Sequence, residues 1–143
     1  IMNESIIKFG SKVELAYTIN DLNEEVLEHT SLPISYEHGK NSGLFKKIEA
    51  NLSGKKVGDI VNVTLLPEEG FGYPNERLTF TDDINNVPEQ FRKLGAEVEF
   101  KNDKGESKQF TVSKIENGQL TVDGNHPFAG KTVIFRIKVM SIK

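Results

Sequence analysis

The chain has 143 residues, of which 36% are hydrophobic and 27% charged, with a formal net charge of −3. This length and composition fit one compact domain, or one domain that carries a small insertion, and exclude a disordered chain. The sequence contains no cysteine, which excludes disulfides, thiol catalysis and thiolate metal ligands.

Charge and apolar patterning narrow the possible partners. The 18 basic and 21 acidic residues are interspersed, so we do not expect nucleic acid as a partner. Apolar runs are too short to span a membrane and no signal peptide is visible, so we expect a cytoplasmic protein with no membrane partner. The three histidines form neither an H-x-H nor an H-E-x-x-H pattern, so we expect no metal and no cofactor.

Alternation of apolar and polar residues predicts the strands of the first half of the chain. The expected strands cover residues 12–20, 26–28, 33–36 and 60–66. One helix is expected from Ser42 to Gly54, with Ser42 as its N-cap and Gly54 as its stop. Four apolar residues share one face of this helix at helical spacing: Leu44, Phe45, Ile48 and Leu52.

The second half of the chain is also rich in expected strands. These cover residues 78–81, 96–101, 108–116 and 119–122, with a capped helical turn at 86–91. Asn117-Gly118 predicts a two-residue hairpin. The apolar residues expected to form the core and a client-binding surface of this segment are Leu78, Phe80, Val87, Phe91, Leu94, Val98 and Phe100.

The last expected strand, residues 131–142, alternates over its whole length. Val133, Phe135, Ile137 and Val139 fall on one face, which predicts a long strand with one buried side. Such a strand must pair with an earlier one, so we expect it to close the sheet.

Polar residues outside these elements have simpler expected roles. Adjacent carboxylates point apart in a strand or loop, so we expect both Glu68-Glu69 and Asp82-Asp83 to be solvated. His126 lies in a turn-rich stretch, and we expect it to form a structural hydrogen bond there.

That stretch, Asp123-Gly124-Asn125-His126-Pro127-Phe128-Ala129-Gly130, resembles the DGNHPLAG signature of the SlyD/SlpA class of FKBP-type peptidyl-prolyl isomerases. Further stretches are similar to motifs of the same family, and together they cover almost the full chain: Leu15-Ala16-Tyr17, Leu44-Phe45-Lys46-Lys47-Ile48-Glu49, Lys55-Lys56-Val57-Gly58-Asp59, Gly70-Phe71-Gly72 and Val133-Ile134-Phe135.

The resemblance implies an α+β fold, an FKBP-like twisted antiparallel sheet wrapped on one helix. The isomerase domain would comprise residues 1–76 and 123–143. Residues 77–122 would form a small β-rich insert-in-flap domain, which binds unfolded chains in this family. The histidine-rich tail of many SlyD proteins is absent, which favours an SlpA-like or tailless SlyD-like member.

The resemblance also implies an apolar pocket between the helix and the concave face of the sheet. The residues that would have catalytic roles there are Tyr17, Glu28, Phe45, Phe71 and Phe135. The residues that would bind substrate are Leu27, Ile34, Tyr36, Leu44, Ile48 and Tyr73. Four positions depart from the usual family pattern, namely Glu28 for Asp, Phe45 for an aliphatic residue, Lys47 for Gly and Phe71 for Tyr.

Such a pocket suits rotation about a prolyl bond because no covalent bond is made and no nucleophile, metal or redox group is required. The implied partners are unfolded or proline-containing polypeptides, and we expect a monomer. One alternative is a chaperone holdase with weak or no isomerase activity. Another is a carbohydrate- or nucleic-acid-binding β-barrel, which has little support beyond strand content.

Overall fold

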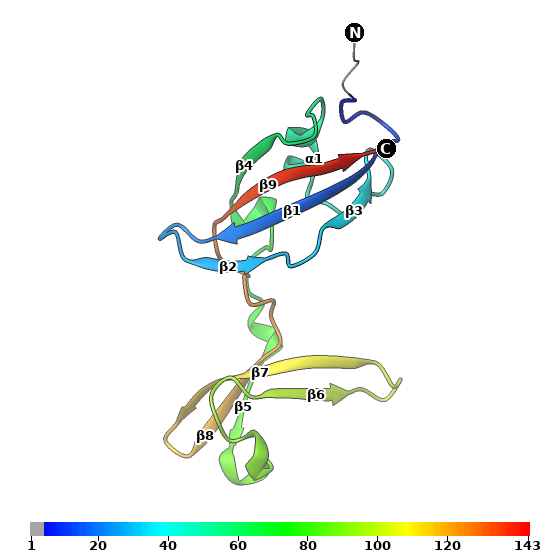
Figure 1. Ribbon diagram of the computed structural model, residues 1–143. Helices are drawn as coiled ribbons and strands as arrows, with labels where there is room; N and C mark the ends of the chain where they lie inside the picture. The colour runs from blue at the N-terminus through cyan, green and yellow to red at the C-terminus, as the bar shows by residue number, and fades with distance from the viewer. Residues whose placement is uncertain (1–4) are drawn as a thin grey trace. The chain divides into compact units, whose positions relative to one another are not determined.

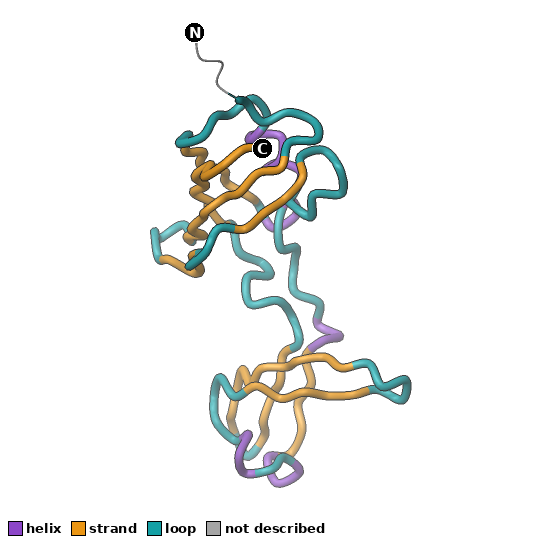
Figure 2. Tube along the Cα trace, turned by 45° about the vertical axis from the view of Figure 1, so that its right-hand side comes forward, coloured by secondary structure: helices purple, strands orange, loops and turns teal. Residues whose placement is uncertain are grey.

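The computed structural model describes residues 5–143. The chain divides into two compact units: the first contains the chain up to Tyr73 together with Gly130–Lys143, and the second contains Pro74–Ala129. Each unit has its own antiparallel sheet (Figures 1 and 2). The second unit is therefore inserted into the first in sequence.

The sheet of the first unit has five strands, in the order β2-β1-β9-β4 with β3 paired to β1. Its strands are β1 (Lys12–Asn20), β2 (Val26–His29), β3 (Ile34–Glu37), β4 (Ile60–Leu65) and β9 (Val133–Ile142). Every pairing is antiparallel. Strand β9 lies between β1 and β4 (Figure 1), so the prediction that the last strand closes the sheet is confirmed.

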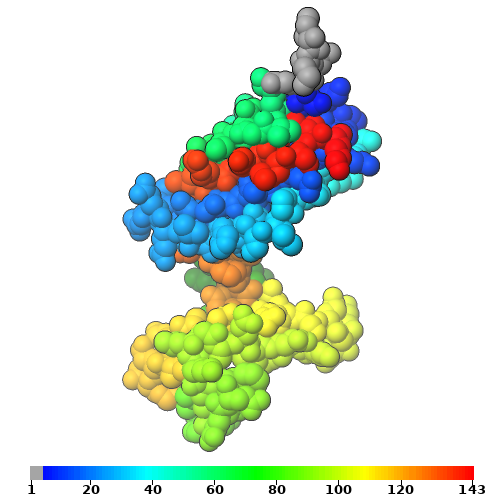
Figure 3. Space-filling model, viewed as in Figure 1, coloured from blue at the N-terminus to red at the C-terminus, as the bar shows by residue number. Residues whose placement is uncertain are grey.

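The alternation in β9 separates a core face from a solvent face. Val133, Phe135, Ile137 and Val139 are all buried. Residues between them, such as Arg136 and Lys138, are exposed, and the outer atoms of β9 reach the surface between those of β1 and β4 (Figure 3). Phe135 pairs with Ile19 of β1 and Val63 of β4, so its side chain starts from the middle of the sheet.

The helix α1 (Lys46–Leu52) begins later than the sequence predicts. Ser42 is not its N-cap, because the Ser42 hydroxyl accepts from the Leu44 N–H (3.2 Å) in the preceding turn. Gly43 stands at φ +79°, a left-handed conformation that a helix does not contain. Gly54 does follow the helix end, at φ +82°. No helix in residues 5–143 is both long and apolar enough to cross a bilayer.

The second unit has a four-stranded sheet in the order β5-β8-β7-β6. Asn117 and Gly118 have φ of +52° and +74°, so they form the predicted two-residue hairpin turn between β7 and β8. The strands are β5 (Thr79–Asp83), β6 (Glu97–Lys101), β7 (Ser107–Glu116) and β8 (Gln119–Asp123). Short 3-10 turns occupy Glu76–Leu78, Ile84–Asn86 and Glu89–Phe91.

The core of the second unit differs from the expected set. Its buried members are Ala96, Phe110, Val112, Leu120 and Val122, with Ile84, Val87 and Val98 packed against them. Phe80, Leu94 and Phe100 belong to the set expected to form the core and a client-binding surface together, and they are exposed by 55%, 65% and 49%. Phe80 and Phe100 lie on β5 and β6, the edge strands of the sheet, whereas most buried members come from its central strands β7 and β8.

Hydrogen bonds of Asn125 link the chain segment that enters the second unit to the segment that leaves it. Its side-chain oxygen accepts from the Asn75 N–H (2.8 Å), and its amide donates to the Asn75 carbonyl (3.1 Å). The same amide donates to the Asp123 carboxylate (2.7 Å). The expected insert, residues 77–122, is shorter at both ends than the observed unit, and Asn75 and Asn125 are linked just outside the expected bounds.

Candidate active site

Four aromatic rings meet in the first unit, each from a different segment. Phe135 of β9 is central, with its ring centroid 5.6 Å from Tyr17 of β1, 6.1 Å from Phe45 and 6.4 Å from Phe71. Phe45 is the N-cap residue of α1, and Phe71 follows the 3-10 turn Pro67–Glu69. Phe45 and Phe71 meet edge to face at 5.1 Å. We call these four rings the aromatic cluster.

The aromatic cluster is anchored in the core yet partly open to solvent. Phe135 is only 7% exposed, whereas Tyr17, Phe45 and Phe71 are half-buried. At Phe45 the cluster borders a hollow of about 450 Å³, which is lined by Leu44, Phe45, Lys46, Lys47, Glu68 and Glu69. Apolar ring faces within reach of solvent can bind an apolar group.

Tyr17 and Glu28 form a polar pair beside the rings. The Tyr17 hydroxyl donates to Glu28 Oε2 at 2.9 Å. Burial raises the pKa of the Tyr17 hydroxyl, and the hydrogen bond and negative charge of Glu28 raise it further. Tyr17 therefore stays neutral at physiological pH, and its single proton is directed at Glu28.

Four of the six predicted substrate-binding residues lie on or next to elements that contribute a ring, or on strands that pair with β1. Ile48 is a buried residue of α1, 3% exposed and about one turn after Phe45. Leu44 precedes Phe45 and is half-buried. Ile34 pairs with Leu15 on β1, two residues from Tyr17. Leu27, also half-buried, precedes Glu28 in β2, where the pairing with β1 is irregular.

Tyr36 and Tyr73 do not join the aromatic cluster. Tyr36 pairs with Val13, four residues along β1 from Tyr17 and so about 13 Å away. It is 7% exposed, and its hydroxyl lies 3.0 Å from His38 Nδ1. Tyr36 is therefore a core residue, and its predicted contact with substrate stays a prediction. Tyr73 is 65% exposed, with its hydroxyl bonded to Glu68 (3.2 Å).

Glu68 is exposed, as expected, whereas Glu69 is half-buried and has a structural contact in addition. Glu69 Oε1 accepts from the Leu66 N–H at 3.0 Å and so caps the turn that leads to Phe71. A local signal for this role exists in the sequence, since Pro67 at the first position and Glu69 at the third are typical of a helical start.

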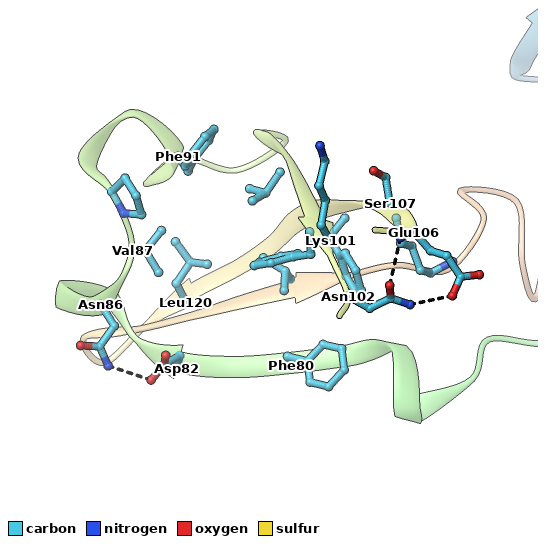
Figure 4. A pocket seen from close by; sticks show the side chains of 16 residues that line it. Phe80, Asp82, Asn86, Val87, Phe91, Lys101, Asn102, Glu106, Ser107 and Leu120 are labelled. Atoms are coloured by element: carbon cyan, nitrogen blue, oxygen red, sulfur yellow. Dashed lines mark hydrogen bonds between the residues drawn. The ribbon is translucent and has the colours of Figure 1, made fainter. Parts of the chain in front are cut away.

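A second apolar hollow lies within the second unit, on its sheet (Figure 4). It measures about 950 Å³ and is mostly apolar, with Phe80, Phe91, Phe100 and Phe110 in its lining. Phe110 contacts Phe80 at 5.7 Å and Phe100 at 5.2 Å. Polar residues, including Asp82, Asn86, Lys101 and Glu106, stand at its margins (Figure 4). We call this hollow the phenylalanine groove.

An antiparallel sheet with one helix and an apolar aromatic cluster fits the fold class of the FKBP-type isomerases. Known proteins support this class. The chain is 30% identical over 145 residues to the FKBP-type 16 kDa peptidyl-prolyl cis-trans isomerase of Escherichia coli (strain K12), which covers 99% of this chain and 96% of the relative. The chain therefore belongs to the FKBP-type peptidyl-prolyl cis-trans isomerase family.

Other relatives agree. The FKBP-type isomerase SlyD of Aeromonas hydrophila is 33% identical over 141 residues, which cover 93% of this chain and 63% of that protein. A probable 16 kDa FKBP-type isomerase of Pseudomonas fluorescens is 28% identical over the whole of this chain and 96% of its own length. The chain thus spans less than two thirds of the SlyD relative. No family model matches the chain.

Proposed function

We propose that this protein catalyses cis–trans rotation of Xaa–Pro peptide bonds at the aromatic cluster. The observation that carries this proposal is the meeting of four rings from separate segments, three of them half-buried. A prolyl ring is apolar and compact, so aromatic faces are suitable walls for it.

Rotation about the prolyl bond requires removal of solvent from the amide more than it requires reactive groups. Rotation breaks amide resonance, with a barrier of about 18–20 kcal/mol, and uncatalysed exchange takes on the order of tens to hundreds of seconds. The twisted amide is less charge-separated than the planar amide. An apolar surface that replaces water therefore favours the twisted state relative to the planar one.

Tyr17 supplies a polar contact at the edge of this surface. Its hydroxyl is bonded to Glu28 in the free protein, and a tyrosine has only one proton to donate. A substrate carbonyl can accept that proton only in place of Glu28. We propose that Glu28 orients the hydroxyl before the substrate arrives.

The test is a protease-free isomerisation assay on a short peptide with one Phe-Pro bond. We expect Phe71→Ala to lower kcat/KM by about fivefold, since the ring contributes on the order of 1 kcal/mol to the apolar wall. The matched control is Phe9→Ala, because Phe9 is 70% exposed. Equal kcat/KM for Phe71→Ala and wild type would contradict the assignment of the site.

We propose a second activity, the holding of unfolded client segments in the phenylalanine groove. The specific support is its exposed apolar lining, since Phe80 and Phe100 are 55% and 49% exposed. Exposed apolar patches of this kind mark interaction surfaces. In an alternative form of this proposal, the protein is a holdase with weak or no isomerase activity.

Aggregation of a chemically denatured client separates these readings. We expect Phe80→Ser and Phe100→Ser to reduce suppression of aggregation while rotation of the short peptide is unchanged. Phe9→Ser is again the control. If the wild type suppresses aggregation but leaves the peptide unaccelerated, the holdase reading is correct.

A further inference from the structure

Lys47 connects the start of α1 to the end of β4 and to the turn that precedes Phe71. Its ammonium donates to the Thr64 carbonyl at 2.8 Å, near the end of β4. The same ammonium lies 3.4 Å from each carboxylate oxygen of Glu69. One side chain thus holds both a strand end and the turn that follows it.

Glu69 in turn shapes the loop that carries Phe71. It caps the Leu66 N–H, and the Gly70 and Gly72 N–H groups both donate to the Pro67 carbonyl, at 3.1 and 2.7 Å. The hydrogen bond from Leu66 lowers the pKa of the Glu69 carboxyl, and the hydrogen bond and charge of Lys47 lower it further. Glu69 is therefore ionised, and so paired with Lys47, throughout the physiological range.

The two ends of this connection lie next to the two facing rings. Lys47 is two residues after Phe45, and Glu69 is two residues before Phe71. Those rings meet edge to face at 5.1 Å. A change in the Lys47–Glu69 distance would therefore move one ring relative to the other.

We infer that Lys47 is a positioning residue for the aromatic cluster, an inference that rests on the isomerase function proposed above. Its ammonium fixes the Phe71 loop against the start of α1. The Lys47 and Glu69 side chains are 43% and 34% exposed, so the ion pair contributes little to folding. Its effect is on the geometry of the rings.

The experiment compares Lys47→Met, which keeps the aliphatic stem, with Lys47→Arg, which keeps the charge and donors. The control is Lys138→Met, because Lys138 is on the exposed face of β9. We expect kcat/KM for the Phe-Pro peptide to fall roughly tenfold in Lys47→Met through loss of ring alignment. Lys47→Arg and Lys138→Met should match the wild type, and all variants should melt together.

An NMR titration of Glu69 adds a second measurement, the pKa of this carboxyl, which a general loss of stability would not change. The pKa of Glu69 should rise in Lys47→Met and not in Lys138→Met, and the ring-proton shifts of Phe45 and Phe71 should change in the same variant. Full kcat/KM in Lys47→Met despite a raised Glu69 pKa would overturn the inference.

Failure of the proposed isomerase function gives a different result. In that case the wild type itself does not accelerate rotation, and the ring-proton shifts alone decide the positioning role. Changed shifts of Phe45 and Phe71 in Lys47→Met would support it, and unchanged shifts would overturn it.

Discussion

Gly124 provides a sharp test of how the turn motif supports the second unit. A Cβ added at this position would lie 2.6 Å from Phe110 Cε2 and 2.9 Å from Phe110 Cδ2. Phe110 is 6% exposed and belongs to the core of the unit. The φ of Gly124 is outside the left-handed region, and the third close atom, Lys108 Cε at 3.0 Å, is near the end of a flexible side chain. The contact with Phe110 therefore sets most of the cost of Gly124→Ala.

Overpacking of this kind costs about 1–3 kcal/mol. A unit of this length has a stability of roughly 3–8 kcal/mol, so Gly124→Ala removes a large share of it. Amide hydrogen exchange in β7 and β8 should accelerate by about 5- to 150-fold, while exchange in β1 and β9 is unchanged. Phe110 lines the phenylalanine groove, so client holding should also weaken.

A leucine at position 110 has no atom where Phe110 Cε2 stands, so the double variant is the control. Gly124→Ala should cost less in the Phe110→Leu background than in the wild type. Equal exchange rates in β7 and β8 of wild type and Gly124→Ala would refute the steric reasoning.

Three further changes test other parts of the account. Tyr17→Phe removes the proton directed at Glu28, so peptide kcat/KM should fall several-fold, with the melting temperature nearly unchanged. Burial, followed by the charge of Glu49, raises the pKa of Tyr36 from 10.0 to about 12. The folded state then holds the Tyr36 proton more tightly than the unfolded state does. The contribution of this proton to folding stability is complete below pH 10 and is lost as pH rises to about 12. Between pH 10 and 12, the free energy of unfolding should fall less in Tyr36→Phe than in the wild type. Asn125→Ala breaks both bonds to Asn75 and should cost about 1–2 kcal/mol, with faster amide exchange at Asn75.

Each of these predictions has a contrary outcome. Full activity in Tyr17→Phe would leave the hydroxyl without a catalytic role. An equal loss of stability in Tyr36→Phe between pH 10 and 12 would assign that loss to other groups, such as the lysines. Unchanged exchange in Asn125→Ala would mean that the backbone alone holds the joint.

The sequence predicts the strands well because their signal is local. A residue of a half-buried strand alternates with its neighbours whatever lies across the sheet, and β9 shows this over its whole length. The predicted start of the helix, at Ser42, was wrong. Leu44 and Phe45 have helical spacing, but they follow Gly43, whose left-handed backbone prevents the helix from beginning earlier.

The aromatic cluster could not be predicted from periodicity. Its rings come from β1, the start of α1, a loop and β9, and only the fold brings them together. The family resemblance supplied those positions, whereas Tyr36 shares the same alternation but packs in the core beside His38. The catalytic roles, the client-binding role of the second unit, the monomeric state and the cytoplasmic location stay predictions.

Exchange NMR on a peptide with a single Phe-Pro bond, mixed with labelled protein, tests the central claim most directly. We predict cross-peaks between the cis and trans signals that grow with protein concentration, and contacts from the prolyl ring to Phe71 and Phe135. No acceleration over buffer, or acceleration with the prolyl ring in contact only with the phenylalanine groove, would contradict the account.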